Sequence, residues 1–438
     1  MLGKPTFAPY PCKGGSMGIT TDFVTRRRFL WLGAVAAGTL ALGGCEAESA
    51  PPASAPTAFD EPADGGVSGD SSGARDGSPD SIAAVDEAAA ARLSAMTLEQ
   101  KVAQLFIVAP EALVEDVSQV TQAGDATHAG LTAWPVGGIV YFAQNLIDPD
   151  QATAMLANMK GFYSEDGNVP PFLGVDEEGG TVVRVAGNEV FAAPNVGDAS
   201  ALGAAADEAA AKEAAEQIAD YLAPLGFNLD FAPVCDVVDP LRSDTMGLRS
   251  FSSDANVCAA MVKAEVQGFL GAGMLCCAKH FPGIGSAPGD SHTGAIAVEK
   301  TAEELAAVDF VPFKAAIEAG VPMIMVGHVD LPNIVEGAVP ASLSSAVAQG
   351  MLRDTLGFTG IIVTDSLAMG AITDRYSAAE AAVAALAAGC DIPLMPESFP
   401  EAYQGVLDAV AAGALTEERI DESVLRILKA KQQYIGGL

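Results

Sequence analysis

The sequence predicts an α/β fold, a single (β/α)8 TIM-type barrel over residues 85–438, preceded by a disordered N-terminal signal and tether. Eight short, β-rich apolar runs alternate with helix-like stretches, which favours a parallel barrel over an antiparallel sandwich. An open doubly wound sheet would need a Gly-rich phosphate-binding turn after its first strand, and residues 108–111 do not form one. Only helix-like sequence follows the eighth run, so we expect one barrel domain rather than two smaller domains.

Apolar runs of strand length and longer, Ala-rich stretches set the order of the elements. The predicted strands are residues 104–108, 138–142, 172–175, 229–234, 274–278, 323–326, 360–364 and 391–395. The helix-like stretches include residues 150–163, 204–225, 257–270, 302–319 and 378–388. Upstream of these helices, Thr97 and Gln100 have the spacing of a capping box, which predicts that a helix begins there.

Residues 1–44 have the pattern of an export signal. The basic residues 26–28 precede the apolar run 29–42, and small residues follow at a cleavage site. The run is shorter than the roughly 20 residues of a spanning helix. The adjacent arginines resemble a twin-arginine signal, and residues 42–45 resemble a lipobox, which implies a lipid on Cys45. We therefore expect an exported protein, lipid-anchored at the extracellular face of the cell membrane; an uncleaved membrane anchor is the alternative.

Residues 45–84 are predicted to form a disordered acidic tether. The segment is mostly Ala, Pro, Ser, Gly and Asp, with Phe59 as its aromatic residue. Such a composition cannot bury enough apolar surface to offset the conformational entropy lost on ordering. The acidic tether would hold the domain away from an anionic surface.

Composition excludes several classes of protein. The chain has 56 acidic and 23 basic residues, a formal net charge of −33, so nucleic acid and anionic lipid would meet like charge. Apart from the anchor at Cys45, no membrane contact is therefore expected. The 7 cysteines are too sparse for a disulfide scaffold and match no zinc-finger spacing. Cys276 and Cys277 would point to opposite faces of a strand, so no bond is expected between them.

Polar residues follow the predicted strands at the end where barrel enzymes carry their chemistry. Of the 4 histidines, His280 and His328 follow two of these strands, and His292 lies in the loop after the first of them. The residues near these strand ends include Asp176, Glu177, Glu178, Arg184, Asp236, Lys279, His280, His328 and Asp365. Their common placement predicts one polar pocket.

Each of these residues also has a structural interpretation. Asp365 has the position of a helix cap, His280 that of a rim histidine, and Lys279 that of a structural ion-pair partner. Asp236 is as readily a hydrogen-bonding structural acid, and we leave it out of the site. The pair Glu177–Glu178 is more typical of solvated loop charges or arginine partners than of catalytic acids.

Two other kinds of site fit the sequence less well. Residues 290–292, Asp-Ser-His, suggest a hydrolase triad, but three consecutive residues cannot be oriented around one substrate, and the chain has no Gly-x-Ser-x-Gly elbow. His280, His328, Asp236 and Asp365 would suit a metal-dependent barrel hydrolase, but such enzymes usually carry a His pair on the first strand, and this strand has none. We expect no metal and no cofactor.

Six motifs together resemble glycoside hydrolase family 3. They occur in the family's order, and the resemblance extends over nearly all of residues 95–436. The motifs are Met96–Lys101, Val175–Gly180, Gly247–Phe251, Lys279–Gly283, Asp290–His292 and Thr364–Met369. One departure is that residues 284–286 are Ile-Gly-Ser, where the family often has His-Gly-Asp after Lys-His-Phe-Pro-Gly.

The Asp-Ser-His loop resembles the β-N-acetylglucosaminidase branch of that family. The resemblance implies a retaining enzyme that removes terminal β-linked N-acetylglucosamine from peptidoglycan fragments or related glycans. It implies Asp365 as nucleophile, His292 as acid/base and Asp290 as the partner of His292. The implied sugar-binding residues are Asp176, Arg184, Arg249, Lys279 and His280.

The implied roles agree with elementary chemistry. A retaining glycosidase needs one carboxylate that attacks the anomeric carbon and one group that gives and later removes a proton. An imidazole with an ordinary pKa of about 6.5 serves both half-reactions near neutral pH. Three glycines in residues 283–289 would let the loop carry His292 into and out of the site.

Four alternative functions remain open at this stage. The β-glucosidase or β-xylosidase branch and a glycosyl phosphorylase belong to the same family. A non-catalytic glycan-binding lipoprotein and a metal-dependent barrel hydrolase belong to other classes.

Overall fold

The computed structural model describes residues 79–438 apart from 115, 242, 244, 245, 290 and 292. The predicted signal, Cys45 and most of the predicted tether lie outside the described residues. Helix α1 (Pro79–Ala95) begins inside the segment assigned to the tether, because its Ala-rich sequence continues to favour a helix. In the described part of the chain, no helix combines the length and apolar character needed to span a membrane.

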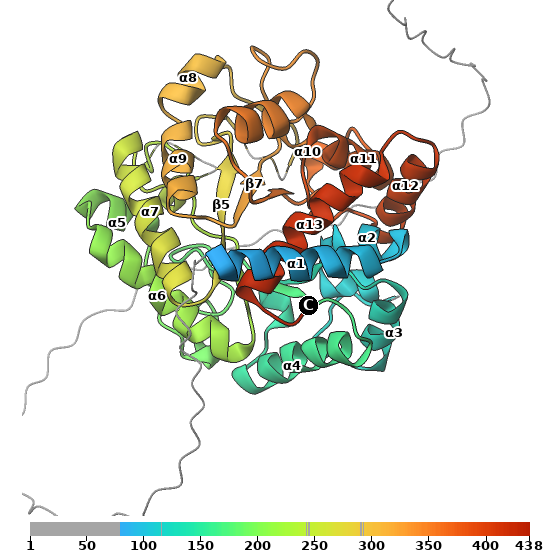
Figure 1. Ribbon diagram of the computed structural model, residues 1–438. Coiled ribbons are helices and arrows are strands. Elements are labelled where there is room, and N and C mark those ends of the chain that lie inside the picture. Colours follow the sequence, from blue (N-terminus) through green and yellow to red (C-terminus); the bar gives the residue numbers. More distant parts are fainter. Residues whose placement is uncertain (1–78, 115, 242, 244–245, 290, 292) are drawn as a thin grey trace, which may run out of the picture. The chain divides into compact units, whose positions relative to one another are not determined.

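Strands and helices alternate along the described chain (Figure 1). The strands are β1 Ile107–Val108, β2 Gly138–Tyr141, β3 Phe172–Val175, β4 Leu229–Asp230, β5 Leu275–Phe281, β6 Ile296–Ala297, β7 Met323–Val326, β8 Val329–Asp330 and β9 Ile361–Thr364. The remaining α-helices are α2 Leu98–Gln104, α3 Asp125–Ala133, α4 Pro149–Glu165, α5 Ala199–Ala205, α6 Glu208–Leu225, α7 Ala255–Gly271, α8 Ala302–Ala307, α9 Phe310–Glu318, α10 Gly370–Thr373, α11 Ala378–Ala388, α12 Phe399–Ala411 and α13 Glu417–Tyr434. The short 3-10 helices are η1 Pro110–Leu113, η2 Ala143–Asn145, η3 Glu189–Phe191, η4 Gly247–Arg249 and η5 Ala341–Leu343, and η6 Ala346–Thr355 is a π-helix.

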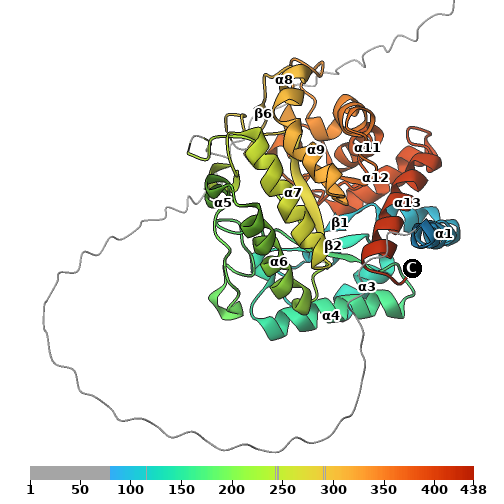
Figure 2. The same cartoon turned by 60° about the vertical axis from the view of Figure 1, so that its left-hand side comes forward.

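The central sheet is parallel, with strand order β1-β2-β3-β4-β5-β7-β9. Every residue of these strands is buried, as expected where both faces of a sheet are covered. Helices α6, α7 and α9 lie side by side on the outside of the curled sheet (Figure 2). The predicted α/β barrel class is confirmed. Because all strands run the same way, the polar residues that follow them meet at one edge.

The predicted eighth strand, residues 391–395, is wrong as a strand. Single parallel bridges join Ile392 to Val363 on β9 and Leu394 to Ile107 on β1. Pro393 has no amide hydrogen to donate, and Met395 has a positive φ of 45°. An irregular segment therefore closes the curled sheet between its two edge strands.

Asp391 stabilises this closing segment. Its carboxylate is fully buried and pairs with Arg353 at 2.5 Å and with Arg426 at 2.9 Å. It also accepts hydrogen bonds from the hydroxyl of Ser423 at 2.6 Å and from the amide of Ile362 at 2.9 Å. These bonds from β9, η6 and α13 take the place of a regular strand ladder.

Two other predicted strands are shorter than expected. Residue 104 still belongs to helix α2, so β1 does not begin before Ile107. In the predicted strand 229–234, regular pairing ends at Asp230, and a single parallel bridge joins Val234 to Lys279 after Pro233, which has no amide hydrogen to donate.

Two predicted helices are divided. In residues 204–225, α5 ends at Ala205 and α6 restarts with Asp207 as its N-cap, whose side chain accepts bonds from two backbone amides. Residues 302–319 divide likewise into α8 and α9. The capping box between Thr97 and Gln100 is confirmed.

Candidate active site

A cavity of about 480 Å³ opens at the carboxyl edge of the sheet. Six of the sequence-predicted site residues line it: Asp176, Arg184, Arg249, Lys279, His280 and Asp365. The apolar part of the wall includes Phe142, Phe231, Met325 and Leu394. The other predicted residues, Asp290 and His292, lie outside the described residues. Ser291, between them in the sequence, lines the cavity, and its carbonyl accepts a bond from the Ala371 amide at 3.2 Å.

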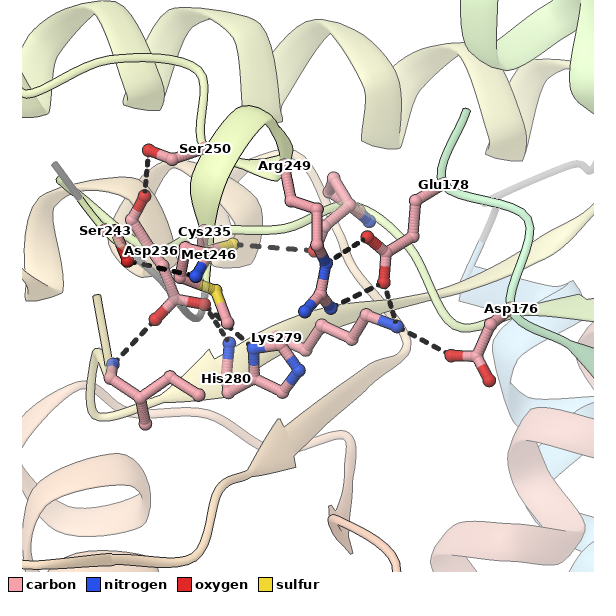
Figure 3. A network of polar contacts seen from close by, with 12 residues as sticks. Asp176, Glu178, Cys235, Asp236, Ser243, Met246, Arg249, Ser250, Lys279 and His280 are labelled. Carbon is pink, nitrogen blue, oxygen red and sulfur yellow. Dashed lines mark hydrogen bonds and ion pairs between the residues drawn. The ribbon is translucent and has the colours of Figure 1, made fainter. Parts of the chain in front are cut away.

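Glu178 joins two cations that, like it, line the cavity (Figure 3). Lys279 Nζ lies 2.6 Å from Glu178 Oε1 and 2.7 Å from Asp176 Oδ1. Arg249 approaches Glu178 with Nε at 2.7 Å and Nη2 at 2.8 Å, a bidentate pair. We call these four residues the ionic clamp. It connects the loop after β3 with β5 and η4.

Glu178 and Lys279 of the clamp stay ionised near neutral pH. Burial disfavours the charged form of Glu178, but Lys279 and Arg249 outweigh it and hold the carboxyl pKa well below its usual range. Burial likewise disfavours the ammonium of Lys279, but Asp176 and Glu178 raise its pKa above the ordinary value. Lys279 is therefore both an ion-pair partner, as its structural interpretation held, and part of the cavity wall.

Glu177 holds the loop that carries Arg184. Its buried carboxylate accepts bonds from the backbone amides of Arg184 at 2.6 Å, Val185 at 2.9 Å and Ala186 at 2.8 Å. It also accepts a bond from the Tyr221 hydroxyl at 3.0 Å. Neither acid of the Glu177–Glu178 pair is thus a solvated loop charge. Glu178 is the arginine partner that the sequence left open, and its position two residues after Asp176, near the end of the strand, was the available signal.

Arg184 brings an unsatisfied donor to the cavity. Its guanidinium carbon lies 6.0 Å from the centre of the Phe142 ring, and its buried Nε has no hydrogen-bond partner within the described structure.

Asp236 acts as the structural acid that the sequence analysis left out of the site. Its carboxylate is fully buried and accepts bonds from His280 Nδ1 at 2.8 Å and from the Ile284 amide at 2.7 Å. The Nδ1–H bond to a carboxylate leaves Nε2 as the ring nitrogen of His280 available to a ligand. The Lys279–His280 peptide bond is cis.

Asp365 follows β9 and does not cap a helix, because α10 begins later, after Met369. Its Oδ1 accepts the Ser366 amide at 2.8 Å, and its own amide donates to the Val326 carbonyl at 2.9 Å. Burial opposes ionisation, but His280, the Ser366 amide and Lys279 together outweigh it, so the pKa of Asp365 lies below its ordinary value. The result is a charged carboxylate on a rigid strand end.

His328 contacts the residue next to Asp365. The sequence predicted that His328 lies in the pocket but gave it no catalytic or binding role. Its Nε2–H donates to the Ser366 carbonyl at 2.8 Å. Burial lowers the pKa of His328, so the neutral ring accepts the Ser342 hydroxyl at Nδ1, 2.7 Å away. This chain of bonds fixes the turn that presents Asp365. Its partner Ser342 could not be identified from sequence, because it lies on a separate 3-10 helix, η5.

A buried, charge-paired cavity around one carboxylate, at the carboxyl edge of a parallel barrel, is typical of barrel enzymes that act on polar substrates. Among the described residues, no group of three or more His, Cys, Asp and Glu side chains is arranged to hold a metal ion. The chain belongs to glycosyl hydrolase family 3, because the model of that family's N-terminal domain matches residues 97–430.

Named relatives agree with this family. The chain is 33% identical over 347 residues to beta-hexosaminidase LpqI of Mycobacterium tuberculosis, covering 76% of this chain and 82% of that protein. It is 31% identical over 325 residues to beta-hexosaminidase A of Pseudoalteromonas piscicida, covering 69% of this chain but 54% of that protein. A solved family 3 β-N-acetylglucosaminidase from Paenibacillus superposes with a TM-score of 0.73 at 37% identity, covering 78% of this chain and 63% of that one.

We predict that Asp236→Asn lowers the free energy of unfolding by about 1–3 kcal/mol, because one amide oxygen cannot accept from both His280 and Ile284. Urea unfolding at pH 7 measures the change. The matched control is Asp374→Asn on an exposed residue, which should stay within about 0.5 kcal/mol of the parent. Equal stability of the two variants would contradict the structural role of Asp236.

Proposed function

We propose that the protein is a retaining β-N-acetylglucosaminidase of the β-hexosaminidase type, which hydrolyses terminal β-linked N-acetylglucosamine. Family membership and the names of the relatives support a glycoside hydrolase of this kind. The observation that carries the proposal is the charged Asp365 on the wall of a cavity that the residues of the ionic clamp also line. The substrates we propose are peptidoglycan fragments or related glycans outside the cytoplasm.

Asp365 is the proposed nucleophile. One of its oxygens accepts the Ser366 amide, and the second is left to bond to the anomeric carbon. As that bond forms, the glycosidic C–O bond breaks and the leaving oxygen takes a proton from His292. A water then gives a proton back to His292 and attacks the same carbon, which releases Asp365. Asp290 is the proposed partner of His292, and the place of Ser291 on the cavity wall supports this loop as the source of the acid/base.

The ionic clamp is the proposed sugar-binding surface. Lys279, Arg249 and Arg184 supply donors for hydroxyl groups, and Asp176 supplies an acceptor. Because Lys279 and Arg249 are already held by Glu178, little side-chain entropy is lost when the sugar binds. His280 adds a further polar contact from the neighbouring position on β5.

The substrate prediction is that 4-nitrophenyl β-N-acetylglucosaminide is hydrolysed at least about tenfold faster than the β-glucoside, which is about 1.4 kcal/mol of transition-state discrimination. Released 4-nitrophenol measures both rates. The reverse preference would place the enzyme among β-glucosidases. Rates that depend on added phosphate would assign glycosyl transfer to phosphate instead of water.

The catalytic prediction is that Asp365→Ala loses turnover by about 10⁴-fold or more, because no covalent intermediate can form. His292→Ala should lose about 10²–10⁴-fold with poor leaving groups and less with 4-nitrophenol, which needs little protonation. Mass spectrometry of the parent trapped with a fluorinated sugar should find the adduct on the Asp365 peptide. Full activity of Asp365→Ala would refute the mechanism.

We also propose that residues 1–44 direct export and that Cys45 carries a lipid anchor. The supporting observation is the sequence pattern of basic residues, apolar run and lipobox-like residues. The full chain should be found in the membrane fraction with a lipid mass on Cys45, and Cys45→Ser should shift it out of that fraction. A Cys45→Ser variant that stays membrane-bound would instead indicate an uncleaved anchor.

A further inference from the structure

A second, small cavity borders the ionic clamp. Its volume is about 10 Å³, which is close to the least space that holds one water molecule. We call it the rear cavity. Its lining includes Glu178 and Arg249 of the clamp and Glu265 of α7. Glu178 and Arg249 therefore face the substrate cavity and the rear cavity at once.

Glu265 is a buried acid without a partner. The residue is 8% exposed, and among the residues that the structure describes no side chain or amide hydrogen-bonds or ion-pairs with its carboxyl group. Burial, together with the like charge of Glu178, raises the pKa of Glu265 to about 8. The group is therefore mainly neutral at pH 7 and carries a proton that it can donate.

The groups around Glu265 account for this behaviour. Glu178 after β3, Arg249 on η4 and Asp198 before α5 share the rear cavity with it, and the Cys276 thiol on β5 lies within electrostatic range. Glu178 already uses both of its oxygens on Arg249 and Lys279. Among the residues that the structure describes, Glu178 is the acid that forms an ion pair with Arg249, and Asp176 and Asp236 act on it only at longer range.

Ionisation of Glu265 would change the clamp. The two acids and two cations of the clamp balance each other, and a further carboxylate would leave an uncompensated negative charge in a buried place. It would repel Glu178 and compete with it for the guanidinium of Arg249. Either effect draws Arg249 away from the substrate cavity.

We propose that Glu265 is a positioning residue, whose neutral carboxyl group, bridged by one water in the rear cavity to the Glu178–Arg249 pair, keeps Arg249 directed at the substrate and releases it on ionisation. This inference rests on the proposed function for its substrate. Glu265 itself does not touch the substrate cavity.

The test compares the parent with Glu265→Gln, which keeps a neutral donor at the same place. The KM for 4-nitrophenyl β-N-acetylglucosaminide is measured from pH 6 to pH 9.5. For the parent it should rise about tenfold between pH 7 and pH 9, since an acid with a pKa of about 8 is mostly ionised at pH 9. For Glu265→Gln it should stay within about twofold, with kcat at pH 7 unchanged.

The matched control is Glu213→Gln on the exposed side of α6, which should follow the parent profile. If Glu265 had only a structural role, Glu265→Gln would change the free energy of unfolding, but its KM would vary with pH as in the parent. An equal rise of KM in the parent and in Glu265→Gln would overturn the inference.

A second measurement does not depend on turnover. Between pH 4.5 and about 8 the folded chain binds a proton at Glu265 that the unfolded chain has released, so this residue makes the fold less stable as pH rises. The stability advantage of Glu265→Gln in urea should therefore grow from pH 5 to pH 8. If neither the parent nor Glu265→Gln hydrolyses the substrate, the proposed function fails. A stability difference between them that stays constant from pH 5 to pH 8 would separately show that Glu265 is not neutral in the folded chain.

Discussion

The buried carboxylate of Glu178 is the interaction on which the cavity depends. It holds a lysine from β5 and an arginine from η4 within 2.8 Å. Burying either cation without a partner would cost free energy. The shared Glu178 carboxylate offsets that cost by pairing with both cations. Since the three residues come from separate elements, their pairing also determines how the loop after β3 and the η4 turn lie against the sheet.

The same principle operates at the nucleophile. Asp365 keeps its charge in a buried place because the nearby His280 imidazole and the Ser366 amide favour the carboxylate, while the neutral His328 ring holds the Ser366 carbonyl. The imidazoles are themselves fixed, His280 by Asp236 and His328 by Ser342. A site assembled in this way has its polar groups oriented before the substrate arrives, which is the main physical source of rate enhancement in polar active sites.

Charge pairing also stabilises the segment that closes the barrel between β9 and β1. Asp391 forms ion pairs with Arg353 and Arg426 at the point where the closing segment, residues 391–395, meets β9. A strongly acidic chain with 23 basic residues thus places several of its arginines and lysines against buried carboxylates. The clamp and the closing segment differ in one respect, since the clamp faces a cavity and is therefore able to bind a ligand.

Local residue patterns were enough to predict the alternation of strands and helices, because buried strands and amphipathic helices have distinct patterns. The sequence by itself also determined which polar residues follow the strands, and Asp176, Lys279 and Asp365 lie together as expected. Tertiary structure decided the pairing of Glu178 with Arg249, of Asp236 with His280 and of His328 with Ser342. It also decided that residues 391–395 close the sheet without forming a strand. These outcomes depend on burial and on partners distant in the chain, and no local residue pattern encodes either.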